Sequence, residues 1–439
     1  MTPLIQRPDS IRIIRQAYSS GTLDPVDLLE RFLQRCDEVE DRVQAWITLD
    51  KDSALQQARE CARRQRAGEA IGPLHGIPFA VKDVIDIAGL PTRAGSRSRE
   101  FSGPARADAA IVTALRAAGA IIVGKVHTTE YAFFEGPPPT RNPWDIRRTP
   151  GGSSSGSAAA VAAGMVVASL GTQTAGSVVR PAAYCGIAAF KPTSQTGSTY
   201  GVVPFAPSFD TVGWFAARVT DVADIALGLE PQRYRARPAP TQLRIGIVRD
   251  ELLENASPDV MSNVEEVICK LSSAGHVVED VRCRPGLNTL NTQHRVMLEY
   301  EIGRIYAELP GLPAGQVNQA LLDAITRGGN IRLDAYARAR EGIREAQRQV
   351  WGDWSTYDAV MFPAAPGVAP LGMKTGDPSF IVPFTALAGP ITTVPTGFGE
   401  EGMPLGMMVC ARPYTDGDLL QASLRIAEAI EVAPVPTQS

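Results

Sequence analysis

The sequence predicts an α/β fold, and two kinds of segment that alternate along the chain support this prediction. Short apolar runs bounded by Gly and Pro, such as Ile77-Pro-Phe-Ala-Val81, are typical of buried strands. Stretches with a helical repeat of apolar residues, such as 109–118, separate them. This alternation favours a sheet with helices packed against it. A chain of 439 residues is long enough to bury a large core.

The first 70 residues predict three helices. In chain order they are a helix capped by Asp9 or Ser10 that ends near Tyr18, a helix capped by Asp24 with Pro25 at its first position, and a helix over 51–65. These segments carry no catalytic residue types at a meaningful spacing. We therefore expect them to act in packing.

The remaining chain predicts strands and helices in turn. In order they are a strand that ends on Lys82, a helix over 109–118 followed by Gly119, a strand over 120–123, a small-residue helix over 158–167, a strand over 243–248, a helix over 258–273 capped by Ser257, a strand over 276–281, strands at 357–362 and 406–410, and a helix over 419–430. A polar helical region over 284–354, here called the cover, is expected to lie over a site.

Charge and composition narrow the classes of function. The formal net charge of −4 provides no basic field for a nucleic-acid backbone or an anionic membrane surface, so we expect neither partner. The six cysteines are scattered, which favours reduced thiols. The first residues lack the pattern of a secretory signal, and the apolar run 158–170 is shorter than the roughly 20 residues that span a bilayer. These features predict a cytoplasmic protein.

The segment Gly151-Gly-Ser-Ser-Ser-Gly-Ser157 has the most unusual composition in the chain. A flexible linker is the common interpretation of such a run, but this one leads directly into an apolar helix. Between ordered elements, consecutive glycines allow backbone N–H groups to converge on an anion. The pattern G-x-S-x-G around Ser154 lacks the preceding strand that a nucleophile elbow needs.

The sequence offers no histidine base and no metal site, so serine chemistry with a lysine as the base remains. His75, His127, His276 and His294 lie in no catalytic pattern and are expected to be surface or satisfied polar residues, and no metal-binding motif is present. A lysine accepts a proton only when it is neutral, which requires a lowered pKa. Lys82 follows a predicted buried strand, but from its position alone a solvated strand end is the more common interpretation.

Four ordered motifs resemble the amidase signature family. They are Pro78-Phe-Ala-Val-Lys-Asp83, the run 150–164 that begins Pro-Gly-Gly-Ser-Ser-Ser, Gly171-Thr-Gln-Thr-Ala-Gly-Ser177, and Arg180-Pro-Ala-Ala-Tyr-Cys-Gly186. Later segments at 210–213, 357–366 and 389–395 also resemble that family, so the likeness covers about 25–432. It implies one α/β domain over 1–439, with a central mixed β-sheet covered by helices on both faces. Within it we expect N-terminal helices at 1–70, a signature core at 71–215, the cover, and C-terminal core segments at 355–432.

The resemblance assigns roles to individual residues. Ser177 matches the nucleophile, Ser153 the bridging serine whose peptide bond is usually cis, and Lys82 the terminal base. In that scheme Lys82 takes a proton from Ser153, which takes one from Ser177. The N–H groups of the oxyanion hole match four consecutive residues, Thr174, Ala175, Gly176 and Ser177. Ser154 either supports this network or is a structural turn residue.

Three departures from the common family pattern concern the region around the nucleophile. Gln173 stands where Asp is frequent, Ala175 replaces a frequent Gly, and Arg180 lies three residues after the nucleophile instead of two. The arginine position resembles the malonamidase-like branch, which acts on small amides. Arg180 is therefore a candidate for binding a substrate carboxylate, with a buried structural ion pair as the alternative. Tyr131 is a further candidate for substrate binding, with simple packing as its alternative.

The resemblance implies an amidohydrolase that forms an acyl-enzyme on Ser177 and releases ammonia and a carboxylate from a small amide. Two alternatives remain open: the amidase subunit of a tRNA-dependent amidotransferase, and a catalytically inactive amidase fold that serves as a binding protein. The expected partner is a small-molecule amide. No cofactor and no metal are expected, and a homodimer is left open.

Overall fold

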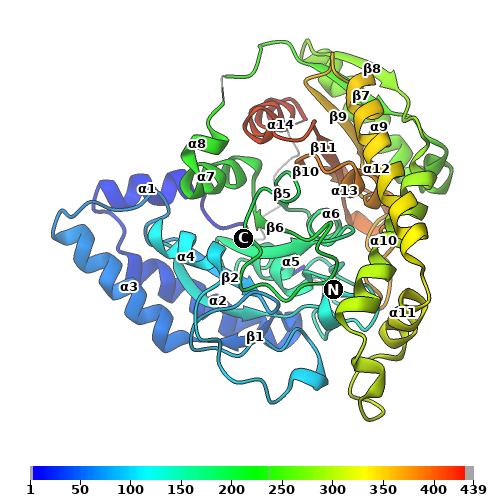
Figure 1. Ribbon diagram of the computed structural model, residues 1–439. Coiled ribbons are helices and arrows are strands. Elements are labelled where there is room, and N and C mark those ends of the chain that lie inside the picture. The colour runs from blue at the N-terminus through cyan, green and yellow to red at the C-terminus, as the bar shows by residue number, and fades with distance from the viewer. Residues whose placement is uncertain (1–2, 237, 431–439) are drawn as a thin grey trace.

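Eleven strands form one mixed sheet among the residues that the computed structural model describes, 3–236 and 238–430 (Figure 1). Their order across the sheet is β1-β3-β2-β4-β6-β5-β10-β11-β9-β7-β8. β2 pairs in parallel with β3 and β4, and β7 pairs in parallel with β9 and β8. The strands between these two parallel groups are antiparallel to their neighbours. The predicted mixed sheet is therefore confirmed.

The strands, in chain order, are β1 (Trp46–Leu49), β2 (Pro78–Lys82), β3 (Ile121–Val126), β4 (Ala168–Gln173), β5 (Ala188–Lys191), β6 (Thr211–Ala216), β7 (Arg244–Val248), β8 (Val277–Val281), β9 (Ala359–Pro363), β10 (Ile391–Phe398) and β11 (Pro404–Cys410). The α-helices are α1 (Ile11–Ser19), α2 (Pro25–Val43), α3 (Lys51–Arg66), α4 (Ala110–Ala117), α5 (Ser155–Ala162), α6 (Val179–Cys185), α7 (Val219–Leu229), α8 (Pro231–Tyr234), α9 (Pro258–Ser273), α10 (Leu287–Ile305), α11 (Gln319–Gly329), α12 (Leu333–Asp353), α13 (Val382–Ala386) and α14 (Asp416–Ile430).

Both faces of the sheet are covered by helices, and the alternation of side chains along the central strands shows it. Phe190 on β5 and Trp214 on β6 belong to the same buried cluster as the apolar residues of α7 and α14. The next residue along each strand points the other way. Ala189 and Phe215 accordingly pack with the small residues of α5 and α6. The small side chains of α5 fit this place because the helix is buried on every side.

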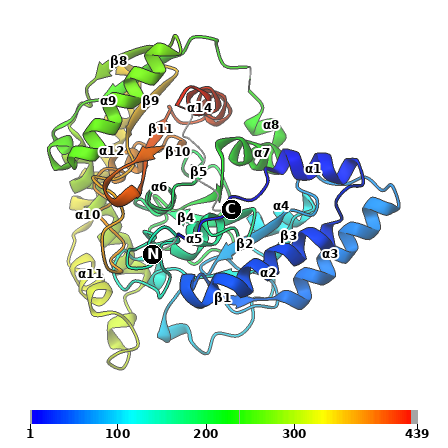
Figure 2. The same ribbon diagram turned by 180° about the vertical axis from the view of Figure 1, so that it is seen from behind.

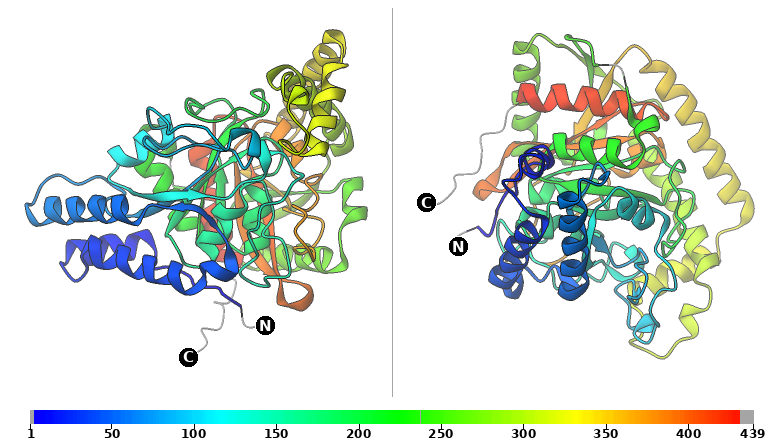
Figure 3. Two further views of the ribbon diagram at one scale, coloured as in Figure 1. Left: turned by 90° about the horizontal axis from the view of Figure 1, so that it is seen from below. Right: turned by 90° about the vertical axis from the view of Figure 1, so that its left-hand side faces the viewer.

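The helices outside this core form two groups on opposite sides of the molecule. Figures 1 and 2 show α1, α2 and α3 on one side and α9, α10 and α12 on the other. The left panel of Figure 3 shows the yellow helices gathered at one end of the molecule, away from the blue ones. The cover predicted over 284–354 is thus helical and consists of α10, α11 and α12.

Helix starts with a side-chain cap agree most closely with the prediction. Ser10, Asp24 and Ser257 each accept a backbone N–H at the start of their helix. The small-residue helix was predicted over 158–167, and this range is wrong at both ends, because α5 runs over Ser155–Ala162. Gly164, with φ +73°, lies in the turn that follows the helix. No helix among the described residues is both long and apolar enough to cross a membrane.

Candidate active site

Lys82 is the last residue of β2, a strand buried along its whole length between β3 and β4. Its side chain is fully buried, so it is not the solvated strand end that its position alone left open. Its Nζ donates to the Oγ of Ser153 at 2.7 Å and to the Oγ1 of Thr172 at 2.8 Å. The structure therefore brings together two of the three residues assigned to catalysis, 71 positions apart in the chain.

The surroundings of Lys82 disfavour its charged form. Burial lowers the pKa of Lys82 well below the ordinary value of a lysine, and the negative charge of Asp210 acts in the opposite direction. Asp210 is itself half-buried, and its removal from solvent raises the pKa of its carboxyl. The partners that contact Nζ are oxygens of hydroxyl and carbonyl groups. A lysine in such a place can act as a base.

Ser153 lies in the turn that leads into α5, and the peptide bond between Gly152 and Ser153 is cis. Ser153 and Ser154 are both fully buried. The hydroxyl of Ser154 donates to the carbonyl of Thr172 at 3.2 Å and accepts the N–H of the same residue at 3.4 Å. Ser154 thus holds the main chain of the residue whose side chain contacts Lys82.

Ser177 lies in the loop 174–178 between β4 and α6, here called the nucleophile loop because Ser177 is the candidate nucleophile, and 8% of its surface is exposed. Gln173, where the family often has Asp, is buried at the base of this loop. Its Oε1 accepts the N–H groups of Val178 and Val179 at 2.9 and 3.0 Å, and its Nε2 donates to Thr385 at 2.9 Å. The amide accepts hydrogen bonds through its oxygen and donates one through its nitrogen. Gln173 in place of the frequent Asp therefore holds the loop with an uncharged side chain.

Several backbone N–H groups of this loop have no hydrogen-bond acceptor within the described residues. Within 3–236 and 238–430, no residue accepts a hydrogen bond from the N–H of Ala175, Gly176 or Ser177. Thr174, the first residue assigned to the oxyanion hole, donates its hydroxyl hydrogen to Asp210. Successive N–H groups without an internal acceptor are able to bind an anionic oxygen.

Arg180 is 1% exposed and lies on α6, behind the nucleophile loop. Its Nη2 donates to the carbonyl of Gly152 at 2.7 Å. Its Nε and Nη1 have no hydrogen-bond partner among the described residues. Burial lowers the pKa of the Arg180 guanidinium, and the charge of Asp377 raises it. The contacts thus include no structural ion pair within the described chain.

Tyr131 is buried, and its contacts are with residues outside the group around Lys82. Its hydroxyl lies 2.8 Å from that of Ser98, and its ring lies 4.8 Å from the ring of Tyr306. These contacts match the packing role that was its alternative. The role in substrate binding stays a prediction.

Sequence reasoning missed four residues that support the site: Thr172, Asp210, Thr385 and His294. His294 was expected to be a surface or satisfied polar residue and not a base, and nothing in the sequence placed it beside the candidate nucleophile. It is 2% exposed, and its Nε2 lies 2.8 Å from the carbonyl oxygen of Thr174 in the nucleophile loop. Thr172 lies inside the motif 171–177, but nothing in that motif identifies it as a partner of Lys82.

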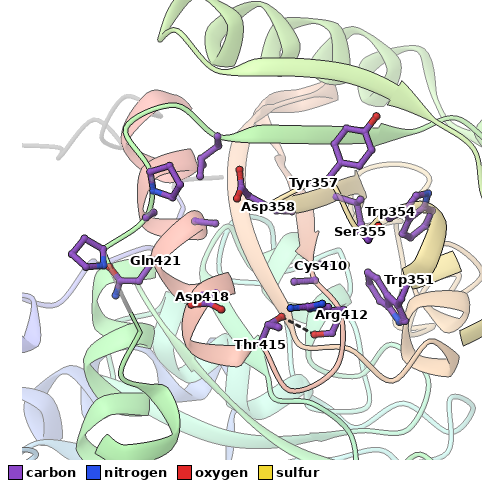
Figure 4. Close-up of a pocket in the computed structure, with 18 residues that line it drawn as sticks. Trp351, Trp354, Ser355, Tyr357, Asp358, Cys410, Arg412, Thr415, Asp418 and Gln421 are labelled. Atoms are coloured by element: carbon purple, nitrogen blue, oxygen red, sulfur yellow. Dashed lines mark hydrogen bonds between the residues drawn. The ribbon is translucent and has the colours of Figure 1, made fainter. Parts of the chain in front are cut away.

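A cavity of about 380 Å³ lies elsewhere, between the end of α12, β9 and α14 (Figure 4). Trp351, Asp358, Arg412 and Gln421 are among the described residues that line it. Lys82, Ser153 and Ser177 are not among them. This cavity is therefore separate from the site.

The comparisons with known proteins agree with this geometry. The amidase family profile matches residues 27–420. The chain belongs to the amidase signature family. It is 34% identical to the A subunit of the Glutamyl-tRNA(Gln) amidotransferase of Chloroflexus aurantiacus, with 94% of each chain covered. The corresponding protein of Symbiobacterium thermophilum is 32% identical, with 97% of this chain and 98% of that one covered.

Solved amidase structures have the same fold. A chain from a vestigial protein complex, described as revealing the origins of an s-triazine catabolic enzyme, superimposes with a TM-score of 0.88 at 28% identity, covering 97% of this chain and 99% of that one. The peptide amidase of Stenotrophomonas maltophilia gives a TM-score of 0.84 at 28% identity, with 98% of each covered. The protein is therefore an amidase, a hydrolase that acts on amide carbon–nitrogen bonds.

One expectation from the sequence is wrong. The net charge of −4 led us to expect no nucleic-acid partner, yet the curated relatives are named as subunits of a tRNA amidotransferase. The net charge of one chain describes only that chain's own average field. It does not exclude nucleic acid from an assembly in which another subunit makes the contacts.

Proposed function

We propose that this amidase is the ammonia-releasing subunit of an amidotransferase, cleaving a small carboxamide so that a partner protein can use the nitrogen. The likeness to the amidotransferase relative from Chloroflexus aurantiacus over 94% of both chains carries this proposal and favours it over an amidase that works alone. The catalytic residues we propose are Lys82, Ser153 and Ser177.

The first half of the reaction forms an acyl-enzyme. The Oγ of Ser177 attacks the amide carbon as its proton passes to Ser153 and the proton of Ser153 passes to Lys82. The contact of 2.7 Å between Lys82 and Ser153 supports the second transfer. The carbonyl oxygen gains negative charge and is stabilised by N–H groups of residues 174–177. The carbon–nitrogen bond then breaks, and the relay returns a proton to the leaving nitrogen, which departs as ammonia.

The second half regenerates the enzyme. Water attacks the acyl carbon and loses a proton to the same relay, and the relay returns a proton to the Oγ of Ser177 as its bond to the acyl carbon breaks. The carboxylic acid then gives its proton to ammonia, and the sum is R-CO-NH₂ + H₂O → R-COO⁻ + NH₄⁺. While the tetrahedral oxygen is negative, Lys82 holds the relayed proton and is positive, so the two charges balance and Lys82 is neutral again at the end.

We further propose that Arg180 binds a carboxylate on the amide that is cleaved. Two nitrogens of its buried guanidinium have no partner within the described chain, and an unpaired buried cation is costly unless a ligand pairs with it. A planar carboxylate matches the donors of an arginine. The amide is then a small molecule with its own carboxylate, such as glutamine, asparagine or malonamate.

Ammonia release by the purified chain tests both statements. We expect activity on glutamine, asparagine or malonamate to exceed that on propanamide and butanamide, and to be lost in Ser177→Ala. Arg180→Met is expected to lose only the preference for the carboxylate-bearing amides. Equal losses on both kinds of amide would contradict the role of Arg180, and full activity of Ser177→Ala would contradict the mechanism.

The role within an amidotransferase needs a second assay. Proteins that co-purify with the chain from its native cells, together with glutamyl-tRNA(Gln) and ATP to activate the glutamyl carboxylate, are expected to convert released ammonia into glutaminyl-tRNA. If the rate and the product stay unchanged when these components are added, the chain is an amidase that works alone. The structural likeness to a peptide amidase favours that second candidate.

A further inference from the structure

The nucleophile loop is held from behind by its carbonyl oxygens. Three consecutive carbonyls, those of Thr174, Ala175 and Gly176, each accept a hydrogen bond. The donors are His294, Thr385 and the backbone N–H of Arg180. The third bond is a local turn into α6, but the first two come from α10 and α13, which are 120 and 210 positions away in the chain. Their distance in sequence shows that tertiary packing fixes these two bonds.

His294 reaches Thr174 from the first helix of the cover. Its Nε2 lies 2.8 Å from the Thr174 carbonyl oxygen, and because a carbonyl only accepts, this nitrogen carries the hydrogen. The imidazole packs against the ring of Phe209, with 4.1 Å between the ring centres. Burial lowers the pKa of His294 to about 4, so near neutral pH the ring is uncharged and has one N–H to donate.

Thr385 holds the next peptide group. Its hydroxyl donates to the Ala175 carbonyl and accepts the Nε2–H of Gln173 at 2.9 Å. The side chain is fully buried, so its single hydrogen has a fixed acceptor. Gln173 also accepts the N–H groups of Val178 and Val179, so the same network ties both ends of the loop together.

A trans peptide group is planar, with its C=O and N–H pointing in opposite directions. Fixing the carbonyl of Thr174 therefore fixes the direction of the Ala175 N–H, and fixing the carbonyl of Ala175 fixes that of the Gly176 N–H. We propose that His294 and Thr385 are positioning residues that aim these two N–H groups at the carbonyl oxygen of the scissile amide. The proposal rests on the proposed function, in which those N–H groups form the oxyanion hole.

Two isosteric pairs of variants test this proposal. His294→Phe keeps the ring against Phe209 and removes the donor, whereas His294→Gln keeps a donor. Thr385→Val removes the hydroxyl, and Thr385→Ser retains it. The substrate probe is p-nitrophenyl acetate, and phenylboronic acid, which adds to a serine hydroxyl to give a tetrahedral adduct, is the probe of the oxyanion hole.

We expect His294→Phe and Thr385→Val each to lower kcat by about 10- to 100-fold, below the 10²–10³-fold loss typical of deleting an oxyanion donor. KM is expected to change by less than about threefold, because the ground-state carbonyl carries little charge. The inhibition constant of phenylboronic acid is expected to rise in proportion to the loss in kcat. His294→Gln and Thr385→Ser are expected to recover most of both quantities.

The matched control is Asn291→Leu, one turn earlier on α10, which removes a hydrogen bond to the Ser379 carbonyl but touches no part of the loop. We expect its kcat and its phenylboronic acid affinity to match those of the wild type. Unchanged kcat in a folded His294→Phe or Thr385→Val protein would overturn the proposal. So would a loss that Asn291→Leu shares, or a loss without a parallel change in phenylboronic acid affinity. If one variant fails to fold, the other pair decides.

Labelling with a fluorophosphonate separates failure of this proposal from failure of the proposed function. If the wild type is not labelled at Ser177 and Ser177→Ala hydrolyses the ester equally well, the proposed function fails. If the wild type is labelled and active while the four variants behave like it, only the positioning role fails.

Discussion

Two lysines on neighbouring strands are equally buried and differ in what lies beside the ammonium group. Lys82 ends β2, and Lys125 lies on β3, paired in register with the residue before Lys82. Both side chains are fully buried. The Nζ of Lys125 lies 3.3 Å from the Oδ1 of Asp83, a carboxylate as buried as itself, whereas Lys82 contacts neutral oxygens of Ser153 and Thr172.

The difference separates a structural cation from the base that we propose. Burial lowers the pKa of both lysines, but for Lys125 the adjacent Asp83 opposes the effect by charge and by hydrogen bonding. For Lys82 the opposing charge is the more remote Asp210, and its pKa lies well below the ordinary value. Burial alone therefore does not make a lysine a base. The neighbours of the nitrogen must also be unable to hold the charged form.

The largest expected effect on activity follows from replacing Lys82, the proposed base. Lys82→Met is expected to lower kcat/KM for amide hydrolysis by about 10³–10⁴-fold, the upper range for general-base catalysis. Lys82→Arg is expected to be equally inactive, because a guanidinium stays protonated. Ammonia release measures the effect, and circular dichroism checks the fold. Retention of a tenth of the wild-type activity in either variant would show that Lys82 is not the base.

Breaking the ion pair between Lys125 and Asp83 is expected to lower the stability of the protein. Lys125→Met leaves Asp83 buried without a cation, and we expect the free energy of unfolding to fall by about 3–5 kcal/mol. The double variant Lys125→Met/Asp83→Asn removes both charges and is expected to recover a large part of that loss. Urea denaturation of the three proteins measures both values. If the single and double variants were equally stable, Asp83 and Lys125 would not be coupled.

Local signals in the sequence predicted a large part of the fold. Ser10, Asp24 and Ser257 mark helix starts because a side-chain cap acts within three residues of itself. The end of α5 was missed because the strong helix preference of Ala carried the predicted helix past the turn at Gly164. The strand order, in which β10 lies beside β5 and β11 beside β9, depends on long-range pairing that no local pattern encodes.

The candidate site also has one part that sequence motifs predict and another that depends on long-range packing. Ser153 and Ser177 could be assigned as candidates because each stands in a dense motif, whereas Lys82 was assigned through the resemblance to the family. The burial of Lys82, which decides between a base and a solvated strand end, depends on β3 and β4 on either side of it. His294 lies in a polar helix without any motif, and only the packing of the cover against the core brings it to Thr174.

A carboxylate placed beside Lys82 would make it resemble Lys125. Thr172→Asp puts a negative charge where a hydroxyl now lies 2.8 Å from Nζ, and we expect the pKa of Lys82 to rise by about 1–3 units. Since Lys82 must be neutral to accept a proton, the acidic limb of kcat/KM is expected to move to higher pH by the same amount. On that limb, activity at a fixed pH is then expected to fall by about tenfold for each pH unit by which the limb moves. Thr172→Asn has the same shape without the charge, and its pH profile is expected to stay in place; equal profiles for both variants would contradict the electrostatic explanation.

The smallest expected effect is on the pH dependence of stability. In the folded protein the pKa of Lys82 is lowered, whereas in the unfolded chain it has the ordinary value of 10.5. Between these two values unfolding takes up a proton, so the wild type gains stability as the pH rises, by at most about 1.4 kcal/mol per pH unit. Below the folded-state pKa and above 10.5 the contribution of this residue is flat.

Lys82→Met lacks this contribution, while Lys125 and the remaining lysines titrate in both proteins alike. Its stability relative to the wild type is therefore expected to be highest at neutral pH and to decline toward pH 10. Urea denaturation at pH 7, 8, 9 and 10 measures the difference. Parallel curves for the two proteins would mean that Lys82 keeps its ordinary pKa in the fold, and the contrast with Lys125 would then lie in geometry alone. A relative stability of Lys82→Met that declines toward pH 10 would show that the fold itself keeps Lys82 neutral, at a cost in stability that the ion pair of Lys125 avoids.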